Sequence, residues 1–304
     1  MSKPFVSHAT VRTAGFGLIE LMIAMVLGLL VLGAAFAVFQ SNQSTYRANE
    51  GLSRVQESAR VAFELMSRDI RAAGGSACSN LAMPDAEKMA NLSSQESAFL
   101  NSPVGSTASE LTVVSGDDTA YRIDSSETNS ITLAPGQIAD ANDAFRTGDA
   151  LVLCNANKLY VVSATGVTPN TVTFSPATPI KMTADNLIRK PGSSDPSPAT
   201  VMLARYRSTR WYLDGTTLRV SRQGGAGEAV AEGVQSLAVS YLQNRAWPGC
   251  AAGSAYTATP TDWNCVTAVR LNMSLVGQFS DQDGGNKTIT RNTSNVVSLR
   301  SRTL

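Results

Sequence analysis

Residues 16–39 read FGLIELMIAMVLGLLVLGAAFAVF, an apolar run whose only charged residue is Glu20. A run of about 24 residues is long enough to cross the hydrocarbon core of a membrane as an α-helix. Two basic residues, Lys3 and Arg12, precede the run, and no acidic residue does. The positive-inside rule therefore predicts that residues 1–15 stay in the cytoplasm and that the chain after residue 39 is exported.

The apolar run differs from an ordinary secretory signal, whose apolar region is shorter and ends in an A-x-A-like cleavage site. Here the run is longer, and no such site follows it. We therefore expect the segment to be retained as a membrane anchor.

Glu20 is the anomaly of this anchor. A carboxylate inside an apolar span costs about 2.5–3.5 kcal/mol on insertion scales, so a partner must compensate it. One alternative is an ordinary anchor in which Glu20 faces a polar neighbour or a water defect.

Residues 15–20, GFGLIE, resemble the type IV prepilin signature of a cleavage-site glycine, an aromatic new N-terminus and a glutamate fifth in the mature chain. The resemblance implies that a prepilin peptidase cuts after Gly15 and that the amine of Phe16 becomes N-methylated. It also implies that Glu20 pairs with a new N-terminal amine during assembly. A buried carboxylate and a buried ammonium each lose hydration, so each needs the other.

Small residues lie within the anchor, with Ala24 one turn before Gly28 and with Gly33 further on. They would allow anchors to approach closely, although glycine is common in membrane helices anyway. Major pilins usually carry a proline where this sequence has Ala37, so the sequence does not predict that the helix melts there.

The helical pattern continues beyond residue 39 to a predicted end at Gly74-Gly75. Apolar residues recur at spacings of three and four: Leu52, Val55, Ala59, Ala62, Phe63, Met66 and Ile70. Charges of alternating sign lie opposite them: Arg47, Glu50, Arg54, Glu57, Arg60, Glu64 and Arg68. Residues 40–75 are therefore predicted to form an exported amphipathic helix with a solvated charged face.

After the glycines, residues 76–304 are predicted to form a β-rich head. Period-two runs indicate strands at 110–114, 130–133, 150–153, 159–164, 171–174, 201–206, 210–213, 217–221, 234–241 and 266–276. We expect an α+β fold in which one long N-terminal helix packs on a mostly antiparallel sheet.

Composition argues against several functions. The net charge is +1 without a basic stripe, so no nucleic acid partner is expected. The only histidine is His8, which lies in the predicted leader, so histidine-dependent catalysis and the usual zinc sites are excluded from the mature chain. Asp117 and Asp118 are adjacent but form no nucleophile–base arrangement, and no phosphate-binding glycine motif is present. We therefore expect neither an enzyme nor a cofactor.

Residues 281–286, DQDGGN, alternate oxygen ligands before glycines, like the start of a calcium loop, but the later glutamate of an EF-hand is absent. A hairpin turn between strands at 266–278 and 287–297 explains the same residues equally well. We therefore expect the chain to hold no metal.

The four cysteines show no C-x-x-C spacing, and an exported domain favours two disulfides. Cys250 and Cys265 are close in sequence and bracket a polar loop with Tyr256 and Trp263, so we expect them to pair. Cys78 and Cys154 then pair by elimination, although four cysteines permit three connectivities.

Short phrases in the head are similar to those of PilW-type minor pilins: SRDIRAAG at 67–74, GDALVL at 148–153, GVQSL at 233–237 and SLRSR at 298–302. The resemblance implies a minor pilin in a tip or priming complex, with its head in the periplasm of a bacterial inner membrane or at the pilus tip on the cell surface. The implied partners are the prepilin peptidase, other minor pilins, the major pilin, the inner membrane and a tip adhesin. A J-type pseudopilin of type II secretion and a membrane-tethered periplasmic binding domain remain the alternatives.

Overall fold

A computed structural model describes most of the chain, which forms two compact units. The first unit holds the residues up to Gly51 together with Gln278–Thr288, and the second holds Leu52–Gly277 and Ile289–Leu304. The described residues are 17–84, 89–105, 109–175, 187, 200–246, 248–251, 253–280 and 286–303.

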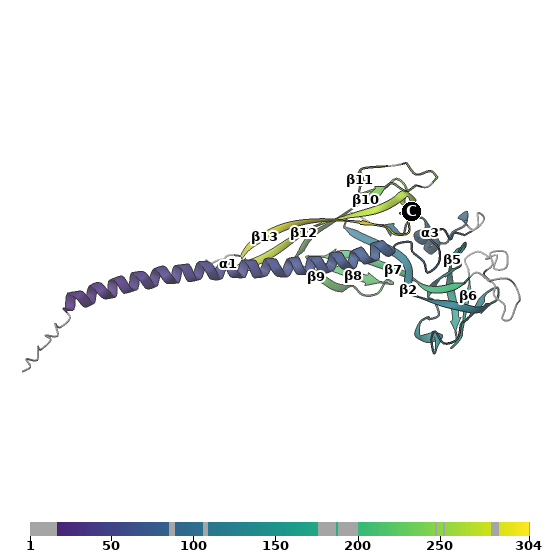
Figure 1. Ribbon diagram of the computed structural model, residues 1–304, viewed down its shortest axis with the longest axis horizontal. Coiled ribbons are helices and arrows are strands. Elements are labelled where there is room, and N and C mark those ends of the chain that lie inside the picture. Colours follow the sequence, from purple (N-terminus) through teal and green to yellow (C-terminus); the bar gives the residue numbers. More distant parts are fainter. Residues whose placement is uncertain are drawn as a thin grey trace, which may run out of the picture. The chain divides into compact units, whose positions relative to one another are not determined.

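The long N-terminal helix that the sequence predicts is present as α1, Leu18–Ala72 (Figure 1). No proline, which would remove a hydrogen bond from the helix ladder, lies within these 55 residues. The helix ends where the sequence predicts, because Gly74 adopts a left-handed φ of +65° just past its last turn. A side chain at Gly74 would also crowd Pro103 and Ser301, each within 3.1 Å of an added Cβ.

The second unit contains a larger β-sheet and most of a smaller one, and every pairing whose register is known is antiparallel. The larger, nine-stranded sheet has the spatial order β1 (Val104–Gly105), β2 (Glu110–Ser126), β3 (Ser130–Leu133), β6 (Thr171–Ser175), β5 (Leu159–Val167), β4 (Ala150–Cys154), β7 (Met202–Asp214), β8 (Thr217–Arg222) and β9 (Glu228–Glu232). Because β2 also pairs with β7, the six strands from β2 to β7 close into a ring. The apolar cluster containing Ile123, Leu153 and Phe174 is formed mostly by residues of this ring, with Phe145 and Leu187 added from connecting segments.

The smaller sheet has the order β11 (Tyr256–Thr257), β10 (Val234–Gln243), β12 (Val266–Ser280) and β13 (Asn286–Ser298). Three short helical segments complete the described elements: α3 (Ser94–Leu100) and the 3₁₀ turns Ala141–Asp143 and Trp263–Cys265. β12 and β13 are neighbours in this sheet, and residues 281–285 between them lie outside the described residues.

One core joins α1 to both sheets. The apolar helix face that the sequence predicts is buried from Ala59 to Ile70, with Met66 and Ile70 fully inaccessible. These side chains share a cluster with Trp211 of the larger sheet and with Leu271 of the smaller one. The α+β prediction is therefore confirmed, but the single sheet that was expected is two sheets, and α1 packs against both.

The prediction of two separate strands at 201–206 and 210–213 is wrong, because β7 runs unbroken through Arg207, Ser208 and Thr209. These polar residues resemble a turn in sequence, yet they pair in register with Ser115, Val114 and Val113 of β2. Polar residues are tolerated there because Arg207 meets a buried carboxylate of α1.

Other elements were missed or were predicted too short. The strand expected at 110–114 extends to Ser126 through a register shift between Gly116 and Ala120. Helix α3 was not predicted, although Ser93 and Glu96 form the capping box that its sequence contains. The strands β1 and β11 have two residues each, too few for a period-two signal, and the five residues of β9 do not alternate between buried and exposed positions.

The shared core predicts that shortening the helix face destabilises the second unit. Met66→Ala should lower the free energy of unfolding by about 2–5 kcal/mol, because Met66 is fully buried and the change leaves a cavity. The matched control is Val61→Ala on the same helix, where Val61 is 45% exposed and the loss should stay within about 0.5 kcal/mol. Urea unfolding followed by tryptophan fluorescence measures both, and equal losses would contradict this assignment of the buried face.

Candidate functional site

The first candidate site is the N-terminal end of α1. Gly15 and Phe16, the predicted cleavage and methylation residues, lie outside the described residues. Glu20 lies in the first turn of α1, where its backbone N–H donates to the carbonyl of Gly17 at 3.0 Å. The positive end of the helix dipole stabilises a carboxylate at this position.

The helix that follows Glu20 is apolar on all sides. An 18-residue window has a mean hydropathy of 2.7, and none of it is buried. By length and composition it is long enough to cross a membrane. An added Cβ at Gly28 or Gly33 would meet no atom within 4 Å, so within the described chain neither glycine is needed for a close contact.

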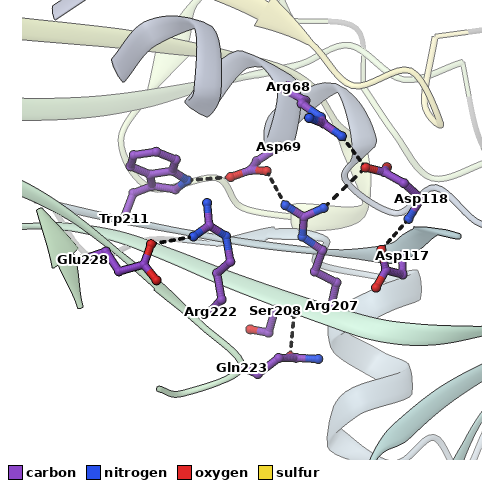
Figure 2. A network of polar contacts seen from close by, with 10 residues as sticks. All are labelled: Arg68, Asp69, Asp117, Asp118, Arg207, Ser208, Trp211, Arg222, Gln223 and Glu228. Atoms are coloured by element: carbon purple, nitrogen blue, oxygen red, sulfur yellow. Dashed lines mark hydrogen bonds and ion pairs between the residues drawn. The ribbon is translucent and has the colours of Figure 1, made fainter. Parts of the chain in front are cut away.

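The second candidate site is a buried carboxylate in the other half of α1. Asp69 is 8% exposed and lies on the apolar face beside Met66 and Ile70. Its Oδ2 accepts a hydrogen bond from the indole N–H of Trp211 at 2.9 Å, and its Oδ1 accepts one from Arg207 at 3.3 Å (Figure 2). Both donors come from β7, so the contact pins the helix to one strand of the larger sheet.

Burial dominates the ionisation of this carboxyl group. Desolvation raises the pKa of Asp69 above its ordinary 3.8, although the Trp211 N–H and the positive charge of Arg207 act in the opposite direction. The charged form is therefore retained at a cost, which is characteristic of a buried group held by specific donors.

Arg207 links Asp69 to a more exposed carboxylate. Asp118 of β2 lies 3.7 Å from Arg207 and also binds Arg68 of α1 (Figure 2). The backbone N–H of Asp118 donates to the carboxylate of Asp117 at 2.7 Å. The Asp117-Asp118 pair thus supplies an ion-pair partner for two arginines, and its contacts are those of a structural bridge between helix and sheet.

The end of α1 is also held by the last residues of the chain. The hydroxyl of Ser301 donates to the carbonyl of Ala73 at 2.6 Å, and the backbone N–H of Arg300 donates to the carbonyl of Arg71 at 3.3 Å. The backbone N–H of Gly74 donates to the carbonyl of Val114 at 2.8 Å. Helix carbonyls that lack an intrahelical partner are thereby satisfied.

Arg302 is buried next to this junction. Its guanidinium donates to the carbonyl of Leu100 at 2.5 Å and to the side-chain oxygen of Asn264 at 2.9 Å. Burial and the nearby charge of Arg245 together lower the pKa of Arg302 to about 9, although the charge of Asp262 acts in the opposite direction. The contacts join α3 to the 3₁₀ turn at Trp263–Cys265, which places the SLRSR phrase at a structural junction.

The four cysteines form two disulfides in the pairing expected from the sequence. Cys78 and Cys154 are joined with a Cα–Cα distance of 6.1 Å, so the segment after α1 is tied to the end of β4. Cys250 and Cys265 are joined with a Cα–Cα distance of 5.5 Å and close a loop whose ends are 15 residues apart.

The closed loop is supported by aromatic contacts. Trp263 meets the ring of Tyr241 edge-on at 4.8 Å, and the guanidinium of Arg270 lies 3.7 Å from the ring centre of Tyr256. Asp262 lies near the two cysteine sulfurs, in the only potential metal-ligand cluster among the described residues. Both thiols are used in the disulfide, so these sulfurs are not available as thiolate ligands.

Of the possible calcium loop at residues 281–286, residues 281–285 and the side chain of Asn286 lie outside the described residues. Its two alternatives stay predictions.

Sequence reasoning missed Asp69 and Arg302. Asp69 carried a signal, because positions 66, 69, 70 and 73 share one helix face by their spacing, and only residue 69 among them is charged. Arg302 carried no such signal, since its partners Leu100 and Asn264 are distant in sequence.

The raised pKa of Asp69 predicts a pH dependence. A carboxyl group whose pKa is higher in the folded state favours folding when it is protonated, so its contribution to stability falls as the pH rises above 3.8 and is constant above the folded-state pKa. The unfolding free energy of the wild type minus that of Asp69→Asn should therefore fall as the pH rises through that window. Urea unfolding of both proteins at matched pH values measures the difference, in which the other carboxyl groups cancel. A difference that grows with pH would mean that Arg207 outweighs desolvation.

Comparison with known proteins bears on the N-terminal site. The family model of the prokaryotic N-terminal methylation motif matches residues 11–36. No curated protein matches the chain. Among solved structures, the chain is similar to the type IV-like pilin TTHA1219 from Thermus thermophilus, with 13% sequence identity and a TM-score of 0.22 over 52% of this chain and 87% of that chain.

A structural likeness at that score carries no argument, so the motif is the finding that matters. It covers residues 16–36 of the apolar run, with Glu20 among them, and it includes Gly15. The chain therefore carries the prokaryotic N-terminal methylation motif, and the apolar helix α1 overlaps this motif from Leu18 onward.

Proposed function

We propose that the chain is the precursor of a minor pilin that a prepilin peptidase cleaves after Gly15. The amine of Phe16 is then methylated, and residues 16–39 anchor the protein in the inner membrane. The observation that carries the proposal is the methylation motif at residues 11–36, which contains a lone carboxylate in an apolar helix.

Glu20 has a specific part in this proposal. Within hydrocarbon its carboxylate lacks water, and the mature N-terminus of a neighbouring subunit offers a cation with the same deficit. Pairing of the two groups removes both costs, whereas an unprocessed chain would place its amine 15 residues away from Phe16. In this proposal, assembly therefore requires prior cleavage, which creates the amine that pairs with Glu20.

The head has properties that suit the periplasm. Both disulfides require an oxidising compartment to persist, which agrees with export of residues 40–304. The helix is fixed to the head by the Asp69 contacts and by the chain end, so a load on α1 reaches the sheets through buried polar bonds. These features support a structural subunit and not an enzyme.

The place in the filament follows from the resemblance of the head to PilW-type minor pilins. We propose a position in a tip or priming complex with other minor pilins, next to the major pilin, with a tip adhesin as a further partner. A J-type pseudopilin of type II secretion would share the same processing. Deletion of the gene separates the two, since loss of pili with normal secretion supports the minor pilin.

The first test is N-terminal processing. Coexpression with a prepilin peptidase should yield a protein that begins at a methylated Phe16, measured by mass spectrometry of the mature N-terminus. Gly15→Leu should block the cut because the small residue is lost, whereas Gly17→Ala, on the other side of Phe16, should still be processed. A chain that starts at Met1 in the presence of the active peptidase would leave a tethered binding domain as the better interpretation.

The second test concerns Glu20. Glu20→Ala should insert into the membrane at least as well as the wild type, since a cost of about 2.5–3.5 kcal/mol disappears, but incorporation into filaments should fall at least tenfold. The matched control is Glu57→Ala, which removes an exposed carboxylate from the same helix outside the apolar run. Fractionation measures insertion, and immunoblotting of sheared filaments measures incorporation. Equal incorporation of the two variants in a strain without redundant minor pilins would refute the assembly role.

A further inference from the structure

The surface of the second unit has a groove between α1 and β13. Its volume is 540 Å³, and its floor is apolar, formed by the buried side chains of Ala59, Phe63, Leu275 and Val297. Figure 1 shows β13 running beside α1, and the hydrogen bond from Arg300 to Arg71 closes one end.

The strand lines the groove with its backbone edge. All residues from 291 to 297 border the groove, whereas the face of a strand would contribute only alternate residues. β13 is the last strand of its sheet, and no described strand pairs with it on the side away from β12. A long edge strand of this kind offers a row of N–H and C=O groups to another extended chain.

The charges at the rim are mostly positive. Arg60 and Arg71 of α1 and Arg291 of β13 are exposed, against the single acid Glu64. Among the described residues, the side chains of these three arginines make no ion pair or hydrogen bond with the rest of the chain. The groove therefore combines an open strand edge, an apolar floor and a net positive charge at its rim.

We propose that this groove binds an extended protein segment that bears carboxylates, which adds to the smaller sheet as a strand beside β13. Backbone hydrogen bonds to residues 291–297 would supply affinity, and the arginines would select the acidic sequence. The assignment of this segment to another filament subunit rests on the proposed function. The chemistry of the groove does not depend on that function.

Two other occupants fit less well. A second copy of β13 would bring Lys287 and Arg291 but no acid, so like charges would meet at the rim. The helix of a second copy carries charges of alternating sign and has no free backbone groups along its length to pair with the strand edge.

The test uses the full chain in detergent micelles and a fluorescein-labelled peptide of about eight residues in which valine and threonine alternate around two glutamates. Fluorescence anisotropy measures its dissociation constant, and hydrogen exchange reports the amides of residues 291–297. The comparison probes are the same peptide with lysines for glutamates, a peptide of residues 286–298 and a peptide of residues 47–72.

The glutamate peptide should bind at least tenfold tighter than the lysine peptide and should slow amide exchange within residues 291–297. Arg291→Glu should weaken its binding about threefold to tenfold, as expected for reversal of an exposed charge pair. The matched control is Arg122→Glu, the same change at an exposed position of β2, which should leave binding unchanged.

The proposal is overturned if no peptide protects residues 291–297, if Arg291→Glu and Arg122→Glu behave alike, or if either peptide from this chain binds tighter than the glutamate peptide. The assay does not involve the N-terminus, so its failure would leave processing at Gly15 untouched.

Discussion

Burial of one face of α1 between two sheets organises the second unit. Met66 and Ile70 are fully inaccessible, and their cluster contains residues of both the larger and the smaller sheet. In this cluster, apolar residues of both sheets pack against the same face of the helix. The position of α1 is therefore a condition for this cluster, whereas the apolar cluster of the ring from β2 to β7 contains no residue of α1.

A buried polar contact gives this apolar packing a unique register. Hydrophobic contacts are non-directional and tolerate sliding, whereas the bonds from Trp211 and Arg207 to Asp69 are satisfied in only one arrangement of helix and strand. Desolvation of Asp69 makes the wrong arrangements costly, because the carboxylate would then be buried without donors. The hydrogen bonds of Ser301 and Arg300 fix the end of the same helix from a different part of the chain.

The two ends of α1 differ in where the partners of their carboxylates come from. The N-terminal end is apolar on all sides and contains one carboxylate whose partner is absent from the described chain. The C-terminal end contains a carboxylate whose partners all come from the same chain. In the proposed function, the carboxylate of Glu20 gains its partner when the filament assembles, whereas the carboxylate of Asp69 gains its partners when the chain folds.

Much of the N-terminal half could be read from the sequence, because its determinants are local. The length of the apolar run, the position of Glu20, the spacing from Ala59 to Ile70 and the glycine at position 74 are properties of neighbouring residues, and they predicted helix α1 and its buried face. The disulfide pairing of Cys250 with Cys265 followed in the same way from a short loop.

The arrangement of the head depended on contacts between distant residues. The division into two sheets, the ring from β2 to β7 and the continuity of β7 through Arg207 depend on which strands meet, and no local pattern contains that information. Arg207 fell between two predicted strands, because the carboxylate that it faces lies 138 positions earlier in the chain and is invisible to a local pattern. Local spacing determined which residues form the helix and its faces, whereas only the tertiary structure decided which polar groups would be buried together, since the cost of burying a charge depends on partners that the fold brings from elsewhere.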